Sequence, residues 1–254
     1  MGRLDNKVCI ITGSNSGVGA ATAELFASEG AKVVITARRQ ELLDAEAEKI
    51  KAAGGTVLAV RCDVSKEEDC IELVRKTVEA FGTVDVLVNN AGVLEAGLKP
   101  VDRCLKEDVD RVLDINAKGT IMCTREVTKI MAEKGSGSVV NVDSVAGEFG
   151  CGGAAYVASK GAVISLTKHT ALRFAGKGIR CNSVCPSTIV TPMTMTTDPR
   201  TLDMEMMGQM AKHADLKVQP CMPMDVAKVL LFLASDDSRP ITGQIIVCDY
   251  GSTL

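Results

Sequence analysis

The stretch that decides the fold is KVCIITGSNSGVG, residues 7–19. Residues 7–12 form a short apolar run, as expected of a strand that is buried on both faces. Glycines follow at positions 13, 17 and 19, and a helical pattern then covers residues 20–28 before Gly30. A strand, a glycine loop and a helix in this order let the backbone approach a pyrophosphate at the helix N-terminus. Because the spacing is GxxxGxG rather than GxGxxG, a purely structural turn is the alternative.

A second apolar run, residues 32–36, leads into Ala37-Arg38-Arg39. Chains that bind NAD usually carry an acidic residue at this point to hold the ribose hydroxyls. Two guanidinium groups without a carboxylate suit a 2′-phosphate instead, because arginine pairs with phosphate in a bidentate way. We therefore expect NADP(H) to be favoured over NAD(H), with two ordinary surface arginines as the alternative.

Strand and helix patterns alternate along the rest of the chain. Strand-like runs occupy residues 56–60, 84–88, 138–142, 179–185 and 244–248, and helical patterns cover residues 40–53, 65–81, 105–134 and 154–176. Ser65 and Glu68 have the spacing of a capping box. A glycine-rich loop spans residues 147–153, and Pro186 opens a long irregular segment. This order predicts an α/β fold in which one doubly wound parallel sheet has helices on both faces, as a single domain over residues 1–254.

The chemically distinctive stretch is Tyr156-Val157-Ala158-Ser159-Lys160. A separation of four places Tyr156 and Lys160 on one face of a helix, one turn apart. A lysine ammonium favours the phenolate form of a nearby tyrosine, so such a hydroxyl can give or take a proton. An isolated YxxxK is more often one aromatic and one solvated lysine, so the rest of the chain must decide.

Composition excludes several classes of protein. A net charge of −3 gives no reason to expect nucleic acid or an anionic membrane as a partner. Ten cysteines lie scattered without CxxC pairs, and there are only two histidines, so we expect no metal site. No export signal is visible at the N-terminus, which together with these unpaired thiols favours a reducing cytoplasm.

Taken together, the motifs resemble the short-chain dehydrogenase/reductase family over essentially the whole chain. The markers occur in the family order: TGxxxGxG at residues 12–19, Asp63-Val64, NNAG at residues 89–92, Asn116, Ser144, YxxxK at residues 156–160, and Pro186 with Thr191. The resemblance implies a seven-stranded parallel sheet, a nicotinamide cofactor, and hydride transfer between a secondary alcohol and a ketone.

The resemblance also implies a role for each site residue. Tyr156 would transfer the proton and Ser144 would hydrogen-bond the substrate oxygen. Lys160 would hold the nicotinamide ribose and favour the phenolate of Tyr156, and Asn116 would support a water relay. The implied cofactor contacts are Gly13, Asn15, Ser16, Gly17, Val18, Gly19, Arg38, Arg39, Asp63, Val64, Asn90, Ala91, Gly92, Tyr156, Lys160, Pro186, Ile189 and Thr191.

Three positions depart from the family pattern. Asp143 precedes Ser144 where a second serine is common, Ser187 replaces the usual glycine after Pro186, and Tyr250 stands where the family often has glycine. A carboxylate at position 143 lies next to the implied catalytic serine, and the residues alone assign it no role. Tyr250 is expected either to pack locally or to reach a neighbouring subunit.

The substrate is predicted from residues 188–224, where the family keeps its substrate lid. Eight of the eleven methionines fall in this segment. Methionine adapts to large apolar surfaces, which favours a bulky apolar substrate such as a hydroxysteroid or bile acid. Packing of the lid itself is the alternative reading of these methionines. A 3-oxoacyl carrier-protein reductase and a catalytically silent cofactor sensor are the alternative functions.

Assembly is a further expectation from the resemblance. The family commonly forms tetramers through its two long helices, here residues 105–134 and 154–176, and we expect a homotetramer. The apolar residues of these helices are also consistent with packing against the sheet alone.

Overall fold

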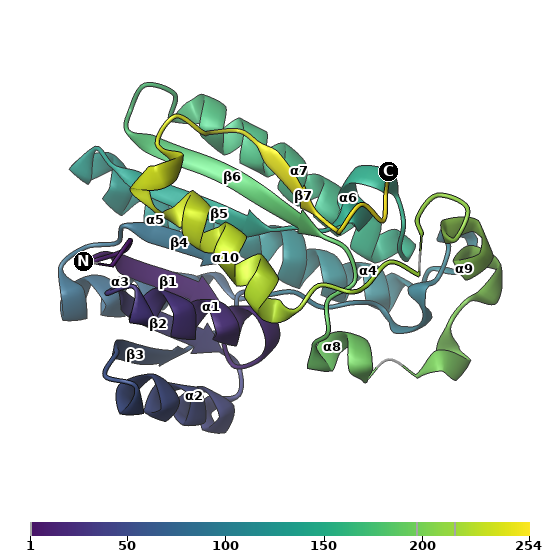
Figure 1. Cartoon of the computed structure of the whole chain (residues 1–254), viewed down its shortest axis with the longest axis horizontal. Coiled ribbons are helices and arrows are strands. Elements are labelled where there is room, and N and C mark those ends of the chain that lie inside the picture. Colours follow the sequence, from purple (N-terminus) through teal and green to yellow (C-terminus); the bar gives the residue numbers. More distant parts are fainter. Residues whose placement is uncertain (1, 197, 216) are drawn as a thin grey trace.

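The computed structural model describes residues 2–196, 198–215 and 217–254. Its centre is a seven-stranded parallel sheet in the order β3-β2-β1-β4-β5-β6-β7 (Figure 1). The strands are β1 (Val8–Thr12), β2 (Lys32–Ala37), β3 (Thr56–Arg61), β4 (Val86–Asn89), β5 (Gly137–Val142), β6 (Ile179–Pro186) and β7 (Ile245–Cys248). The predicted doubly wound parallel sheet is confirmed.

Helices cover both faces of the sheet, and each face has its own apolar core. On one face lie α1 (Gly17–Ser28), α2 (Gln40–Ala52) and α10 (Pro223–Ala234). On the other lie α3 (Glu67–Phe81), α5 (Gly119–Lys134) and α7 (Ala154–Arg173). Residues such as Phe26 and Leu230 in the first core, and Leu73 and Met131 in the second, are fully or almost fully buried. This two-sided burial explains why the strands are apolar at nearly every position.

The chain reverses its direction of winding at β1, which pairs with β2 on one side and with β4 on the other. In such sheets, ligands bind beyond the carboxyl ends of the strands, next to this switch point. The short helices α8 (Pro192–Met195) and α9 (Met204–Met210) lie beyond that same edge (Figure 1).

Two sequence-based predictions about helices are wrong in detail. Helix α3 begins at Glu67 with Lys66 as its N-cap, so Ser65 and Glu68 do not form a capping box. The Ser65 hydroxyl instead donates to Asp63 Oδ1 at 2.7 Å, which holds it in the preceding turn. Residues 147–153 are not only a loop, because α6 (Val145–Phe149) reaches into them.

The predicted helix over residues 105–134 is present but interrupted. It consists of α4 (Lys106–Val112), a π-helical turn η3 (Leu113–Lys118) and α5. π-Helical turns often occur at functional sites, and this one contains Asn116.

The irregular segment after Pro186 also contains helices. It includes α8, the 3-10 turn η4 (Pro199–Thr201) and α9, of which α8 and α9 are capped by Thr191 and Asp203. Helix α10 follows it, and its buried residues recur at helical spacing. Elsewhere, 3-10 turns are η1 (Ala96–Leu98), η2 (Val101–Arg103) and η5 (Asp236–Ser238). Across the described residues, no helix is long and apolar enough to cross a membrane.

Candidate active site

A cavity of about 480 Å³ lies at the carboxyl edge of the sheet. It extends from the end of β2, past the glycine loop after β1, to the helix α7 that carries Tyr156. Sixteen predicted site residues line it: Gly13, Asn15, Ser16, Gly17, Val18, Arg38, Arg39, Asp63, Val64, Asn90, Ala91, Gly92, Tyr156, Lys160, Ile189 and Thr191. Residues from the two halves of the chain therefore meet in one space.

The glycine loop is packed too closely for side chains at two of its positions. A Cβ on Gly13 would lie 2.8 Å from Ala91 Cα, and one on Gly19 would lie 2.4 Å from the carbonyl oxygen of Gly13. Asn90 Nδ2 donates to the carbonyls of Thr12 and Gly13 at 2.9 and 3.1 Å. Gly19 does not line the cavity; it lets α1 approach the loop. The N-terminal turn of α1 consequently faces the cavity.

Both predicted arginines lie at the β2 end of the cavity, where the adenosine half of a dinucleotide is expected. Arg38 and Arg39 are exposed, follow directly after β2 and line the cavity. With its amide oxygen turned toward Arg39, Asn15 accepts from Arg39 Nη2 at 2.9 Å. Burial alone would raise the pKa of Asp63, but hydrogen bonds from Ser65 and the charge of Arg38 hold that pKa below its ordinary value. The arrangement offers guanidinium groups beside an ionised carboxylate.

Tyr156 and Lys160 lie side by side on α7, as the spacing predicts. The Lys160 ammonium is 5.6 Å from the centroid of the Tyr156 ring. Lys160 is only 5% exposed, and its Nζ donates to the carbonyl of Val142 at 2.7 Å. The backbone carbonyl at the end of β5 thus fixes the ammonium beside the phenol.

Ser144 and Asn116 lie near this pair, outside the cavity lining. The Ser144 hydroxyl oxygen accepts from Ala146 N at 3.1 Å as the N-cap of α6, which leaves its hydrogen available to another acceptor. Asn116 is buried, and its side chain bonds both backbone groups of Val93 and, through Nδ2, Ser159 Oγ at 3.0 Å. It ties the loop after β4 to helix α7. Pro186, the remaining predicted contact, is buried at the end of β6.

The helix that carries Tyr156 has a carboxylate at its N-terminus that the motifs do not reveal. Glu95 Oε2 accepts from Tyr156 N at 3.1 Å, and burial raises the pKa of Glu95. Glu95 lies in the loop after β4 and is 3% exposed. No local sequence signal marks it, because it acts across 61 positions of the chain.

Ten other lining residues are not among the predicted contacts, although the sequence analysis noted Ala37 and Asp143. They are Thr36, Ala37, Cys62, Val93, Ile115, Val142, Asp143, Pro192, Met193 and Thr196. Most lie next to a motif residue in the chain, and this adjacency is the only sequence feature that could have predicted them as lining residues. Asp143 differs from the others, since it is a buried carboxyl group that lines the same cavity as Tyr156 and Lys160.

The segment that follows β6 is anchored near its two ends and at α9. Ile189 and Cys221 form an isolated parallel bridge. Arg103 pairs with Asp203 and Glu205, both at 2.7 Å, which ties α9 to η2. Of the two other unusual positions, Ser187 donates its N–H to the carbonyl of Cys248, and Tyr250 is 53% exposed, with its hydroxyl donating to Asp225 Oδ2 at 3.2 Å.

Comparison with known proteins agrees with this geometry. A family model described as enoyl-(acyl carrier protein) reductase, of the short-chain alcohol dehydrogenase type, matches residues 13–253. The chain belongs to the short-chain dehydrogenase/reductase family. It is 41% identical to 3-oxoacyl-(acyl-carrier-protein) reductase FabG of Thermotoga maritima, covering 99% of this chain and 100% of the relative.

Two further relatives extend the comparison. The 3beta-hydroxysteroid dehydrogenase of Mediterraneibacter gnavus is 39% identical, over 100% of this chain and 97% of the relative. The crystal structure of levodione reductase superposes with a TM-score of 0.89 at 34% identity, covering 98% of both chains. Relatives within the short-chain dehydrogenase/reductase family therefore differ in the substrates that their names state.

Short-chain dehydrogenases/reductases use a nicotinamide cofactor, and the residues of this cavity fit one. The close-packed glycine loop and the N-terminal turn of α1 suit a pyrophosphate. Tyr156 and Lys160 lie at the other end of the same space. The described residues contain no cluster of three or more histidine, cysteine, aspartate or glutamate side chains that could hold a metal ion.

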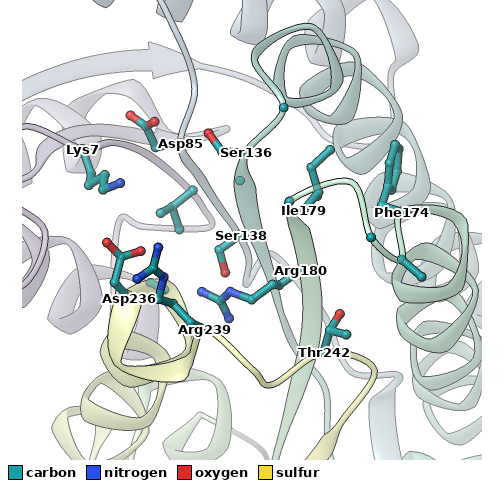
Figure 2. Close-up of a pocket in the computed structure, with 17 residues that line it drawn as sticks. Lys7, Asp85, Ser136, Ser138, Phe174, Ile179, Arg180, Asp236, Arg239 and Thr242 are labelled. Atoms are coloured by element: carbon teal, nitrogen blue, oxygen red, sulfur yellow. The ribbon is translucent and has the colours of Figure 1, made fainter.

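A second cavity, of about 470 Å³, lies at the opposite, amino edge of the sheet. Figure 2 shows Lys7, Arg180, Asp236 and Arg239 facing it. Arg180 Nη2 donates to the carbonyls of Leu233 and Ser235 at 2.9 and 3.0 Å, just where α10 ends. This arginine caps a helix C-terminus.

Proposed function

We propose that the chain is an NADP(H)-dependent oxidoreductase that interconverts a secondary alcohol and a ketone. The observation that carries the proposal is the pair Tyr156 and Lys160, held 5.6 Å apart in the same cavity as the glycine loop. The cofactor, when bound, supplies or accepts a hydride. A ketone reduced beside Tyr156 develops negative charge on its oxygen and needs a proton at that atom.

Each neighbouring residue has a proposed part in this step. Tyr156 gives its phenolic proton to the oxygen, and the free hydrogen of Ser144 donates a hydrogen bond to the same atom. Lys160 is buried, so its charge acts on Tyr156 with little screening by solvent. Asn116 holds α7 in place through Ser159, and it would support a water relay from Lys160 to solvent.

The proposed preference for NADP(H) rests on Arg38 and Arg39. Both are exposed, line the cavity and follow Ala37, which carries no carboxylate to repel a 2′-phosphate. A charge-assisted contact of this kind contributes about 1.5–3 kcal/mol, or roughly 10–100-fold in cofactor preference.

The favoured substrate is a bulky apolar hydroxysteroid or bile acid. The methionines of the proposed lid support this choice, since none of the eight in residues 188–224 is buried. Met195 and Met204 are 74% and 73% exposed, so they are available to cover an apolar ligand. The identity with a 3beta-hydroxysteroid dehydrogenase also supports it.

A 3-oxoacyl carrier-protein reductase is the second candidate, because a relative with that name is 41% identical. Docking of an acidic carrier needs exposed basic residues. Lys129 pairs with Glu126 at 2.7 Å, and the Arg173 guanidinium lies 5.2 Å from the Phe174 ring, so neither is an unengaged cation. Exposed contacts of this kind are worth little, so the preference for a hydroxysteroid rests on the exposed lid methionines.

A direct activity comparison tests the proposal. Steroid ketones and short 3-oxoacyl thioesters are reduced in parallel with NADPH and with NADH. We expect steroid reduction with NADPH to dominate. Efficient turnover of thioesters without turnover of steroids would replace the steroid reading with the carrier-protein reductase.

We also propose that the enzyme acts as a homotetramer. Ile121 on α5 and Leu172 on α7 are 41% and 77% exposed, which leaves apolar surface on both long helices. Light scattering at micromolar concentration is expected to give about four times the chain mass of 26.7 kDa. A mass equal to that of one chain would exclude the tetramer.

A further inference from the structure

Asp143 has one oxygen that no described group satisfies. It directly follows β5, is 3% exposed, and its N–H donates to the carbonyl of Val184 at 2.7 Å. Its Oδ1 accepts from Ser144 N at 3.0 Å. Its Oδ2 is buried and has no hydrogen-bond partner within the described chain. Since leaving a buried acceptor unpaired is costly, such an atom in a binding cavity calls for a functional explanation.

The charged and titratable groups around Asp143 come from three elements. Lys160 reaches it from α7, Glu148 from α6, and the Cys185 thiol from β6. Lys160 is buried and donates to the carbonyl of Val142, the residue before Asp143, and its positive charge favours the ionised form of Asp143. Glu148 is exposed, and its negative charge favours the protonated form of Asp143.

These surroundings make Asp143 a group that titrates near neutral pH. Burial raises its pKa to about 7, although the Lys160 charge and the hydrogen bond from Ser144 N favour the ionised form. Burial, followed by the negative charge of Asp143, raises the pKa of Cys185 to about 12, so that thiol stays neutral. A small change in nearby charge is therefore enough to change the protonation of Asp143.

Asp143 lines the same cavity as Tyr156 and Lys160. Hydride passes between a carbon of the nicotinamide ring and the carbonyl carbon of the substrate, so these two atoms must lie next to each other. Because Tyr156 protonates the oxygen on that carbonyl carbon, the nicotinamide ring is expected at this end of the cavity. The oxidised ring carries a positive charge and the reduced ring is neutral. A carboxylate in a poorly solvated site distinguishes strongly between these two charges.

We propose that Asp143 is a charge-compensating residue, ionised opposite the oxidised nicotinamide and protonated opposite the reduced one. The inference rests on the proposed nicotinamide chemistry and deepens it. When the positive ring enters, the O–H bond of the Asp143 carboxyl breaks and its proton leaves to solvent. When the ring becomes neutral, the carboxylate takes a proton back. No bond to carbon changes at Asp143, and Tyr156 keeps its separate proton transfer to the substrate.

The test counts protons by calorimetry. NADP⁺ and NADPH are each titrated into the enzyme at pH 7, in buffers of different ionisation enthalpy. The 2′-phosphate is common to both nucleotides, so its titration cancels in the difference between them. We expect NADP⁺ binding to release about half a proton or more beyond NADPH binding, because about half of Asp143 is protonated at its pKa.

Affinity provides a second readout of the same linkage. In the wild type, the ratio of the Kd for NADP⁺ to the Kd for NADPH should fall between pH 6 and pH 8, by at most about tenfold per pH unit. Asp143→Asn should bind both nucleotides, abolish the proton difference and give a ratio that is flat with pH. Asp143→Ser provides a second neutral variant should the amide disturb folding.

Glu148→Gln is the matched control, since it removes an exposed carboxylate that acts on the same site. It should keep the proton difference. A difference that persists in Asp143→Asn, or that disappears in Glu148→Gln, would overturn the assignment. Equal proton counts for the two nucleotides in the wild type would reject the role of Asp143 alone, whereas failure to bind either nucleotide would reject the proposed function and the inference with it.

Discussion

The two cavities at opposite ends of the sheet have nearly the same volume, about 480 and 470 Å³. At the amino end, Arg180 donates to the carbonyls that end α10 and to Ser238 Oγ at 2.9 Å. At the carboxyl end, Thr36 Oγ1 and Asp143 Oδ2 are buried without partners in the described chain. No atom of this kind lines the amino-end cavity among the described residues.

The difference shows that volume does not identify a functional site in this fold. Polar groups at the amino end stabilise the ends of helices and strands. At the carboxyl end, Thr36 Oγ1 and Asp143 Oδ2 stay unpaired, at a cost in stability that a bound ligand can offset. Substitutions at the two ends should therefore affect different measurements.

The largest effect is expected from Tyr156→Phe. Loss of the transferable proton should lower turnover by about 10²–10⁴-fold, while nucleotide binding stays nearly intact. Lys160→Ala should impair both, because its ammonium serves the phenol and the proposed ribose contact. Steady-state kinetics together with nucleotide titration measure the two effects separately.

Tyr250→Phe is the control, since it removes the hydroxyl of the other tyrosine of the chain. The Tyr250 hydroxyl donates to Asp225, and Tyr250 does not line the cavity, so the turnover of Tyr250→Phe should be close to that of the wild type. Near-normal turnover of Tyr156→Phe would show that another group transfers the proton.

A stability measurement on Asp143→Asn sharpens the comparison. Asp143 binds its proton more tightly in the folded protein, with a pKa of about 7, than at its ordinary value of 3.8. The contribution of Asp143 to stability should thus be greatest at a pH below 3.8, its pKa in the unfolded chain, and should be lost as the pH rises toward 7. The stability of Asp143→Asn relative to wild type should increase by about 2–3 kcal/mol between pH 5 and pH 8.

Urea unfolding of the ligand-free proteins at several pH values measures this change. Glu148→Gln serves again as the control and should follow the wild type. A constant offset between Asp143→Asn and wild type across this pH range would mean that the carboxyl is not strained in the folded protein.

Cofactor preference should respond to substitutions at the end of β2 and not to substitutions at the amino-end cavity. Ala37→Asp combined with Arg38→Ala should reverse the roughly 10–100-fold preference for NADP(H), because a carboxylate repels the 2′-phosphate and accepts from ribose hydroxyls. Arg239→Ala, at the other cavity, should leave the preference unchanged. Equal use of both cofactors by the wild type would show that Arg38 and Arg39 serve only as surface charges.

The smallest effect is expected at the amino end. Arg180→Met should destabilise the fold by about 1–3 kcal/mol, because carbonyls at the end of α10 lose their donor. Turnover at a temperature well below unfolding should not change. Arg239→Met, at the same cavity, is the control and should fall within about 0.5 kcal/mol of wild type. A large loss of turnover in Arg180→Met would give the amino-end cavity a functional role.

Local patterns in the chain predicted most of the sheet and much of the candidate site. Buried strands in a parallel sheet are apolar at every position, so residues 7–12 and 32–36 could be recognised without any tertiary information. The cap at Ser65 was predicted wrongly because Asp63, two residues earlier, competes for the same hydroxyl. The π-helical turn at Asn116 could not be predicted, since it depends on contacts with Val93 and Ser159.

The sequence by itself determined the alternation of strands and helices, the glycine loop, and the pairing of Tyr156 with Lys160 on one helix face. These features depend on residue type and spacing over a few positions. Only the tertiary structure decided that Asp143 is buried with a free oxygen, that Glu95 caps α7, and that Arg180 caps α10. Glu95 and Arg180 bond groups that lie 61 and 53 positions away, and strands and helices distant in the chain bury Asp143, so no local pattern records these features.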